Sequence, residues 1–181
     1  MRRSPSSAAT LPDRPRLTLV LGGARSGKSA HAETLATAFP SPWTYIATAQ
    51  AFDDEMSERI AIHRARRVDG WETVDAPLDL AAALRAVQEN RPVLVDCLTL
   101  WLSNHLLAGH DLETVSAELE AVLSAPRGPW FVVANEVGLG IVPDNALARR
   151  FRDAAGRLNQ RVAARADSVL FTVAGLPMRV K

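Results

Sequence analysis

Residues 17–29 read Leu-Thr-Leu-Val-Leu-Gly-Gly-Ala-Arg-Ser-Gly-Lys-Ser, and this stretch decides the fold. The apolar run at 17–21 predicts a buried strand, and residues 29–38 have a helical pattern that ends before Pro40. Between the two, every fixed position of the phosphate-binding motif G-x-x-x-x-G-K-[ST] is matched. The nucleotide-binding candidates in this loop are Gly22, Gly23, Ala24, Arg25, Ser26, Gly27, Lys28 and Ser29.

The residue types of the loop fit phosphate chemistry. Glycines let several backbone N–H groups converge on phosphate oxygens, and the N-terminus of the following helix adds partial positive charge. Lys28 can bridge the β- and γ-phosphates as a catalytic residue, and the Ser29 hydroxyl can bind Mg²⁺. The alternative is a chance glycine-rich turn, which would not explain the strand before the loop and the helix after it. The sequence therefore predicts a P-loop.

Downstream of the loop, runs of strand length alternate with helical patterns. Strands are predicted at 43–47, 72–74, 93–96, 130–134 and 168–173, with 178–181 returning along the last one through Gly175. Helices are predicted at 53–67, 79–88, 98–107, 112–123 and 145–165. This alternation predicts right-handed crossovers and a mainly parallel sheet. We expect a three-layer α/β/α fold of the P-loop NTPase type (RecA-like), with one domain at 17–181 after a disordered extension at 1–16.

Length, charge and cysteine content narrow the class of protein. The chain has 181 residues and a net charge of +1, so it has no global field that would recruit nucleic acid. No apolar run approaches the length of a membrane span. Cys97 is the single cysteine; we interpret it as a core residue, and its isolation fits a reducing compartment. We therefore expect a cytoplasmic protein with no nucleic-acid partner and no membrane span.

A carboxylate at the end of a second core strand usually holds Mg²⁺ in P-loop proteins. Asp96 ends the strand predicted at 93–96 and is the metal candidate beside Ser29, although it could instead cap the helix that begins at Leu98. The guanine-reading Asn-Lys-x-Asp of regulatory GTPases does not occur in the sequence, and the chain is short for a motor or transporter ATPase. A small-molecule kinase fits the size.

Further motifs follow the P-loop in order along the chain. They lie at 45–50, 53–56, 59–60, 63–64, 135–143 and 151–160. Together with the loop, this series resembles the bifunctional adenosylcobinamide kinase / adenosylcobinamide-phosphate guanylyltransferase family of cobalamin biosynthesis. The resemblance runs from about Leu17 to Lys181 and rests on several separate motifs.

The resemblance implies two reactions. ATP or GTP phosphorylates the aminopropanol hydroxyl of adenosylcobinamide, and GMP from GTP is then transferred to that phosphate with release of pyrophosphate. The family's covalent GMP-histidine falls on His63, and a neutral imidazole is a competent nucleophile at pH 7. The resemblance also implies a homotrimer, and the chemistry of the P-loop predicts Mg²⁺ as cofactor. The alternatives are an unrelated small-metabolite kinase, or a nucleotide-dependent regulatory protein on the same fold.

Nucleotide contacts are also expected outside the P-loop: the resemblance assigns residues 48–50 and Asp75, while charge and position favour residues 64–67 and Asp96. They are Thr48, Ala49 and Gln50 after the second strand, Arg64, Ala65, Arg66 and Arg67 after His63, and Asp75 and Asp96. The arginines would stabilise the leaving pyrophosphate, unless they form a solvated helix end. Asp75 can accept from guanine N1–H and the exocyclic amine, unless it caps a loop. Asp96 stands where the family would have glutamate, and the roles of Asn135 and Glu136 stay open.

Overall fold

The structure, a computed structural model, describes residues 15–50 and 68–181. The helix predicted at 53–67 and most of the extension predicted at 1–16 lie outside these residues, so both stay predictions. None of the described helices is long and apolar enough to cross a membrane.

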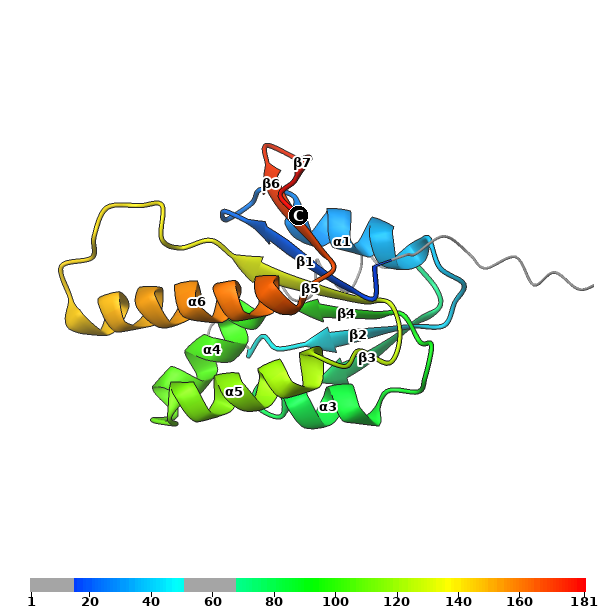
Figure 1. Cartoon of the computed structure of the whole chain (residues 1–181), viewed down its shortest axis with the longest axis horizontal. Coiled ribbons are helices and arrows are strands. Elements are labelled where there is room, and N and C mark those ends of the chain that lie inside the picture. The colour runs from blue at the N-terminus through cyan, green and yellow to red at the C-terminus, as the bar shows by residue number, and fades with distance from the viewer. Residues whose placement is uncertain (1–14, 51–67) are drawn as a thin grey trace, which may run out of the picture.

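The centre of the described chain is a seven-stranded sheet in which every pairing is parallel except the last (Figure 1). The strands are β1 (Leu17–Gly22), β2 (Trp43–Ala47), β3 (Trp71–Asp75), β4 (Val93–Asp96), β5 (Trp130–Asn135), β6 (Ser168–Val173) and β7 (Leu176–Arg179). Their order across the sheet is β3-β2-β4-β5-β1-β6-β7, so β5 lies between the P-loop strand β1 and strand β4. The expected mainly parallel sheet is confirmed.

Helices cover both faces of the sheet. They are α1 (Lys28–Thr37), α3 (Leu80–Ala86), α4 (Leu98–Leu107), α5 (Leu112–Leu123) and α6 (Ala146–Arg165). Of these described helices, α1 lies on one face and the other four lie on the opposite face (Figure 1). The expected three-layer α/β/α architecture is therefore confirmed.

Two apolar cores follow from the alternation of side chains along the strands. Val20, Phe131 and Val133 point to the face that α1 covers, where Ala32 and Ala36 of α1 are fully buried against them. The larger core on the opposite face consists of the intervening strand residues together with side chains from α3, α4, α5 and α6. Because only the short P-loop separates β1 from α1, the N-terminus of α1 lies near the carboxyl end of β1.

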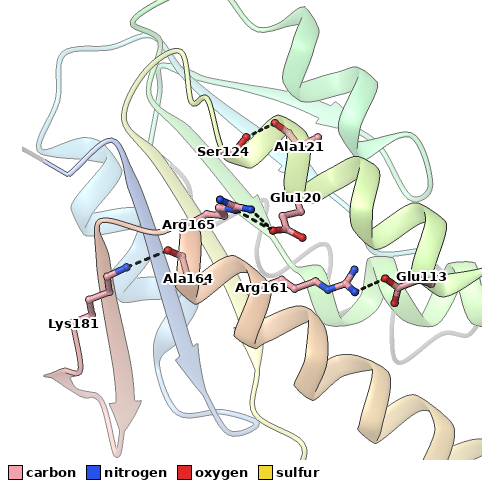
Figure 2. Close-up of polar contacts among 8 residues, drawn as sticks. All are labelled: Glu113, Glu120, Ala121, Ser124, Arg161, Ala164, Arg165 and Lys181. Atoms are coloured by element: carbon pink, nitrogen blue, oxygen red, sulfur yellow. Dashed lines mark hydrogen bonds and ion pairs between the residues drawn. The ribbon is translucent and has the colours of Figure 1, made fainter.

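The helices α5 and α6 are joined at their exposed sides by ion pairs (Figure 2). Arg161 pairs with Glu113, and Arg165 pairs with Glu120 at 2.9 Å. Half-exposed pairs of this kind contribute about 0–1 kcal/mol each, so the buried apolar contacts hold this layer together.

The second strand of the C-terminal hairpin begins earlier than predicted. Strand β7 begins at Leu176, two residues before the predicted 178, because the turn consists of only Ala174 and Gly175. Both turn residues have positive φ (50° and 81°), which is the geometry of the tightest two-residue hairpins. Backbone hydrogen bonds to Val169 continue the pairing as far as Lys181.

Candidate nucleotide-binding site

The P-loop connects β1 to α1 by a tight turn. Gly27, the N-cap of α1, has a left-handed backbone with a φ of 92°, and Arg25 has a φ of 56°. The N–H of Ser26 donates to the carbonyl of Gly23 at 3.3 Å, and the Lys28 ammonium donates to the same carbonyl at 2.9 Å. Lys28 is only 9% exposed, so its charge is held against the loop, where a bound phosphate would meet it.

Two glycines of the loop are required by close contacts with the C-terminal strands. A Cβ on Gly22 would lie 2.7 Å from the carbonyl oxygen of Thr172 and against the Ser26 hydroxyl. A Cβ on Gly27 would lie 3.2 Å from the Cα of Gly175, whose N–H donates to the Ser26 carbonyl at 2.9 Å. The hairpin of β6 and β7 therefore supports the P-loop from the side.

Unpartnered polar atoms gather around the loop. Among the described residues, four buried side-chain atoms lack a hydrogen-bond partner, and three of them are Ser26 Oγ, Thr172 Oγ1 and Asn135 Oδ1. In the sheet, Gly22 pairs with both Asn135 and Thr172. Because buried polar groups are nearly always hydrogen-bonded, such a cluster indicates a place that ligand or water completes. The residues present therefore fit a bound nucleotide.

Asp96 lies at the carboxyl end of β4, on the face that α1 covers. It follows Leu94, whose side chain is in the α1 core, and its carboxylate accepts a hydrogen bond from the Tyr45 hydroxyl at 3.0 Å. The alternative role as a helix cap is not supported, because α4 has Cys97 as its N-cap and no side-chain capping hydrogen bond. The Asp96 carboxylate is therefore left at the sheet edge as a candidate metal ligand.

Asp96 and Ser29 are the described residues that could hold Mg²⁺. Carboxylate and hydroxyl oxygens are ligands that this hard cation prefers. No group of three or more His, Cys, Asp or Glu side chains is close enough to bind a metal among residues 15–50 and 68–181. Few protein ligands are needed for Mg²⁺ at nucleotide sites, because substrate phosphates and water supply the others.

The neighbouring Cys97 is a core residue, as expected. Burial, and next the negative charge of Asp96, raise the pKa of its thiol to about 11, so the thiol stays protonated and unreactive at neutral pH. The positive charge of Lys28 opposes this rise. Lys28 begins α1 and Asp96 lies on the face that α1 covers, so the P-loop lysine and the strand-end carboxylate lie on one side of the sheet.

Thr48, directly after β2, joins two strand ends. Its hydroxyl donates to the carbonyl of Cys97 at 2.7 Å and accepts from the Cys97 N–H at 2.8 Å, and the residue is fully buried. Asn104 donates to the Thr48 carbonyl at 2.8 Å. Because the Thr48 hydroxyl is engaged in this way, the half-exposed Ala49 and Gln50 are better placed to reach a ligand.

Asp75 shares the same edge of the sheet. It is the last residue of β3 and is exposed, and it pairs with Ala47 of β2, which pairs on its other side with Asp96. The two carboxylates thus flank one strand end. In open parallel sheets this carboxyl edge is where ligands bind.

Part of the predicted site lies outside the described residues: His63, Arg64, Ala65, Arg66 and Arg67. Among the other histidines, His105 and His110 lie at the end of α4 and its following turn, with their Nδ1 atoms 2.8 Å apart. The His105 ring also bonds the Leu78 carbonyl through Nε2 at 3.2 Å, and burial lowers its pKa. These contacts give His105 and His110 a structural role.

Two polar residues beside the P-loop had no assigned role from sequence. Thr172 lies next to Gly22 only because β6 pairs with β1, and no local pattern reveals that pairing. Asn135 ends β5, and its position after an apolar run was a detectable signal, but its neighbours depend on the order of the strands.

Solved structures with similar folds support the architecture. A protein from Pyrococcus horikoshii matches with a TM-score of 0.51 and 11% identity over 92% of this chain and 86% of that one. An ATPase of the type III secretion system of pathogenic bacteria matches with a TM-score of 0.51 and 13% identity, over 91% of this chain and 56% of that one. At these identities the likeness shows the fold alone.

Sequence relatives are much more similar. The bifunctional adenosylcobalamin biosynthesis protein CobP of Pseudomonas aeruginosa is 53% identical over 90% of this chain and 96% of its own length. The bifunctional adenosylcobalamin biosynthesis protein CobU of Escherichia coli is 42% identical over 91% of this chain and 99% of its own length. Residues 18–180 match the family described as cobinamide kinase / cobinamide phosphate guanyltransferase. The chain therefore belongs to the cobinamide kinase / cobinamide phosphate guanyltransferase family and is an enzyme of that family.

Proposed function

We propose that this enzyme phosphorylates the aminopropanol hydroxyl of adenosylcobinamide with ATP or GTP, and then transfers GMP from GTP to the new phosphate. The products are adenosylcobinamide-GDP and pyrophosphate. The observation that carries the proposal is the joint placement of the P-loop, with Lys28 held against it, and two strand-end carboxylates at one edge of the sheet in a chain of this family.

In the phosphoryl step, the P-loop residues 22–29 bind the polyphosphate through backbone N–H groups and the N-terminus of α1. Lys28 stabilises the charge on the transferred phosphoryl group. Ser29 and Asp96 would hold Mg²⁺, which supplies charge neutralisation at the phosphates. The substrate hydroxyl attacks the γ-phosphorus, the bond to the β-phosphate oxygen breaks, and the hydroxyl proton is released.

In the guanylyl step, a ring nitrogen of His63 attacks the α-phosphorus of GTP. The new nitrogen–phosphorus bond replaces the bond to pyrophosphate, which leaves. A phosphate oxygen of adenosylcobinamide phosphate then attacks the same phosphorus and releases the imidazole. Arg64, Arg66 and Arg67 stabilise the leaving polyanion, and Ala65 lies within the same nucleotide-binding segment.

Guanine is read by Asp75. This carboxylate can accept from both the N1–H and the exocyclic amine of guanine, which adenine cannot match. We expect Asp75→Asn to reduce the preference for GTP over ITP in guanylylation, because inosine lacks the amine. The loss of a charge-assisted hydrogen bond predicts roughly a tenfold loss of selectivity. Unchanged selectivity would return Asp75 to the role of a loop cap.

The test of the kinase reaction is incubation with adenosylcobinamide and ATP, followed by mass analysis of the corrinoid product. Wild-type protein should form adenosylcobinamide phosphate, and Lys28→Ala should lower its rate severely. An unrelated metabolite kinase would leave the corrinoid unchanged. A regulatory protein would bind nucleotide without any transfer to adenosylcobinamide.

We also propose that the enzyme acts as a homotrimer in the cytoplasm, where ATP and GTP are available. The segment between β5 and α6 supports association of copies, since Leu139, Ile141 and Val142 are exposed by 80%, 98% and 61%. Large apolar side chains exposed together are typical of interaction surfaces. A corrinoid is large, and a site shared between subunits would accommodate it better than a single small domain.

A further inference from the structure

Asn135 is a polar residue beside the P-loop that the proposed reactions do not use. It is the last residue of β5, the strand between β1 and β4. Asn135 pairs with Gly22, the first glycine of the P-loop, while Val133 of the same strand pairs with Asp96. The sheet thus brings Asn135 between the phosphate-binding loop and the candidate metal ligand.

The alternation of β5 gives the direction of the Asn135 side chain. Phe131 and Val133 belong to the core on the α1 face, so Asn135, two residues further, lies on that face as well. Asp96 lies on the same face by the same argument, since it follows Leu94. This is also the face on which α1 and Lys28 lie.

The backbone of Asn135 is fixed by hydrogen bonds, and its amide oxygen has no partner among residues 15–50 and 68–181. Its N–H donates to the Thr99 hydroxyl at 2.7 Å, and its carbonyl accepts from Asn159 at 3.2 Å. The next N–H, that of Glu136, donates to the Gly22 carbonyl at 3.1 Å and so ties this strand end to the P-loop. The Oδ1 atom, in contrast, is buried without a hydrogen bond.

A side-chain amide in this position, with its oxygen unpartnered among the described residues, suits the terminal phosphate of a nucleotide. A side-chain amide offers two N–H donors and a carbonyl acceptor and carries no charge. It can donate to a phosphate oxygen while its own oxygen accepts from a water or hydroxyl beside that phosphate, and it adds no repulsion to a polyanion. The preceding strand positions are apolar, so nothing in the core needs an asparagine there.

We propose that Asn135 contacts the γ-phosphate end of the nucleotide in the P-loop and thereby distinguishes a nucleoside triphosphate from a diphosphate. The proposal rests on the kinase function proposed above. It separates Asn135 from Thr172, whose hydroxyl also lacks a partner among the described residues but which lies on the other side of Gly22, away from Asp96. If Asn135 has only a structural role, its replacement would change the stability of the protein but would leave the ratio of the dissociation constants for ADP and ATP unchanged.

The test compares dissociation constants for ADP and for a non-hydrolysable ATP analogue, both with Mg²⁺, by titration calorimetry. Asn135→Ala should reduce the preference for the triphosphate by roughly tenfold, the usual effect of losing a hydrogen bond to a charged group. Asn135→Asp, which keeps the shape, should reduce it further because its carboxylate repels the phosphate. In both variants, the kcat for phosphorylation should fall together with the preference for the triphosphate, while the KM for ATP changes less.

Asn145→Ala is the matched control. Asn145 is an exposed N-cap of α6 whose side chain accepts from the Ala148 N–H at 2.7 Å, so its loss affects the helix and leaves nucleotide discrimination at the wild-type value. Thermal unfolding without nucleotide checks that each variant is folded. If Asn135→Ala does not fold, the binding constants of Asn135→Asp decide the role of Asn135. If the folded Asn135 variants prefer the triphosphate over ADP as strongly as the wild-type protein does, the inference is wrong. Wild-type protein that binds ATP but phosphorylates no corrinoid would instead overturn the kinase function, and the binding ratio would still decide the role of Asn135.

Discussion

Gly22→Ala is expected to disable the P-loop although it adds a single methyl group. The new Cβ would lie 2.7 Å from the carbonyl oxygen of Thr172 and against the Ser26 hydroxyl. The hydroxyl can rotate away, but the Thr172 carbonyl belongs to β6, which is held between β1 and β7 by backbone hydrogen bonds. The P-loop backbone must therefore move.

The size of the effect follows from this contact. Overpacking a well-packed site costs about 1–3 kcal/mol, and we expect a loss of that order in the free energy of unfolding. A displacement of catalytic groups by about 1 Å lowers rates by roughly 10²-fold. A smaller shift of the loop that carries Lys28 should therefore lower phosphorylation of adenosylcobinamide by at least about tenfold.

Gly23→Ala is the matched control one residue away. In the part of the chain that the structure describes, no atom lies within 4 Å of a Cβ built on Gly23, and its φ is outside the left-handed region. Urea unfolding gives the stability of both variants, and calorimetric titration gives their nucleotide affinity. If Gly22→Ala and Gly23→Ala show equal stability, affinity and rate, the steric argument about Gly22 is wrong.

Three further perturbations test other parts of the site and fold. Asp96→Asn should raise the Mg²⁺ concentration for half-maximal rate by roughly tenfold without unfolding the protein, and an unchanged Mg²⁺ titration would contradict the metal role. Thr48→Val leaves the buried N–H of Cys97 without the hydroxyl that it donates to, removes one of the two hydrogen bonds that the Cys97 carbonyl accepts, and should cost about 1–3 kcal/mol in urea unfolding; wild-type stability would show that other groups replace the hydroxyl. Burial lowers the pKa of His105, so the unfolded state binds more protons and stability should fall as the pH drops below about 6.5, more steeply than in His105→Gln; equal pH profiles would contradict this.

The elements and the P-loop could be predicted from sequence because their signals are local. The loop motif lies between an apolar run and a helical pattern, and both appear in the structure as β1 and α1. Asp96 was recognisable as a candidate because it ends an apolar run. The start of β7 was misplaced by two residues, because the turn at Ala174 and Gly175 is tighter than the prediction allowed.

The environment of the site depends on strand order, which no local pattern contains. Placing β5 between β1 and β4 brings Asn135 beside Gly22, and pairing β6 with β1 brings Thr172 to its other side. The engagement of the Thr48 hydroxyl with Cys97 likewise joins two strands that are far apart in the chain. These contacts arise from non-local packing, so the sequence suggested Asn135 as a position of interest without indicating what surrounds it.

The central claim of two reactions, one of them through His63, is tested most directly by measuring the intact mass of the protein after incubation with GTP and Mg²⁺. Wild-type protein should gain one GMP through a phosphoramidate bond that is labile in acid and stable in base. His63→Ala should gain none, yet it should still phosphorylate adenosylcobinamide, because the P-loop reaction needs no covalent intermediate. A folded His63→Ala protein that still carries an acid-labile GMP would contradict the account.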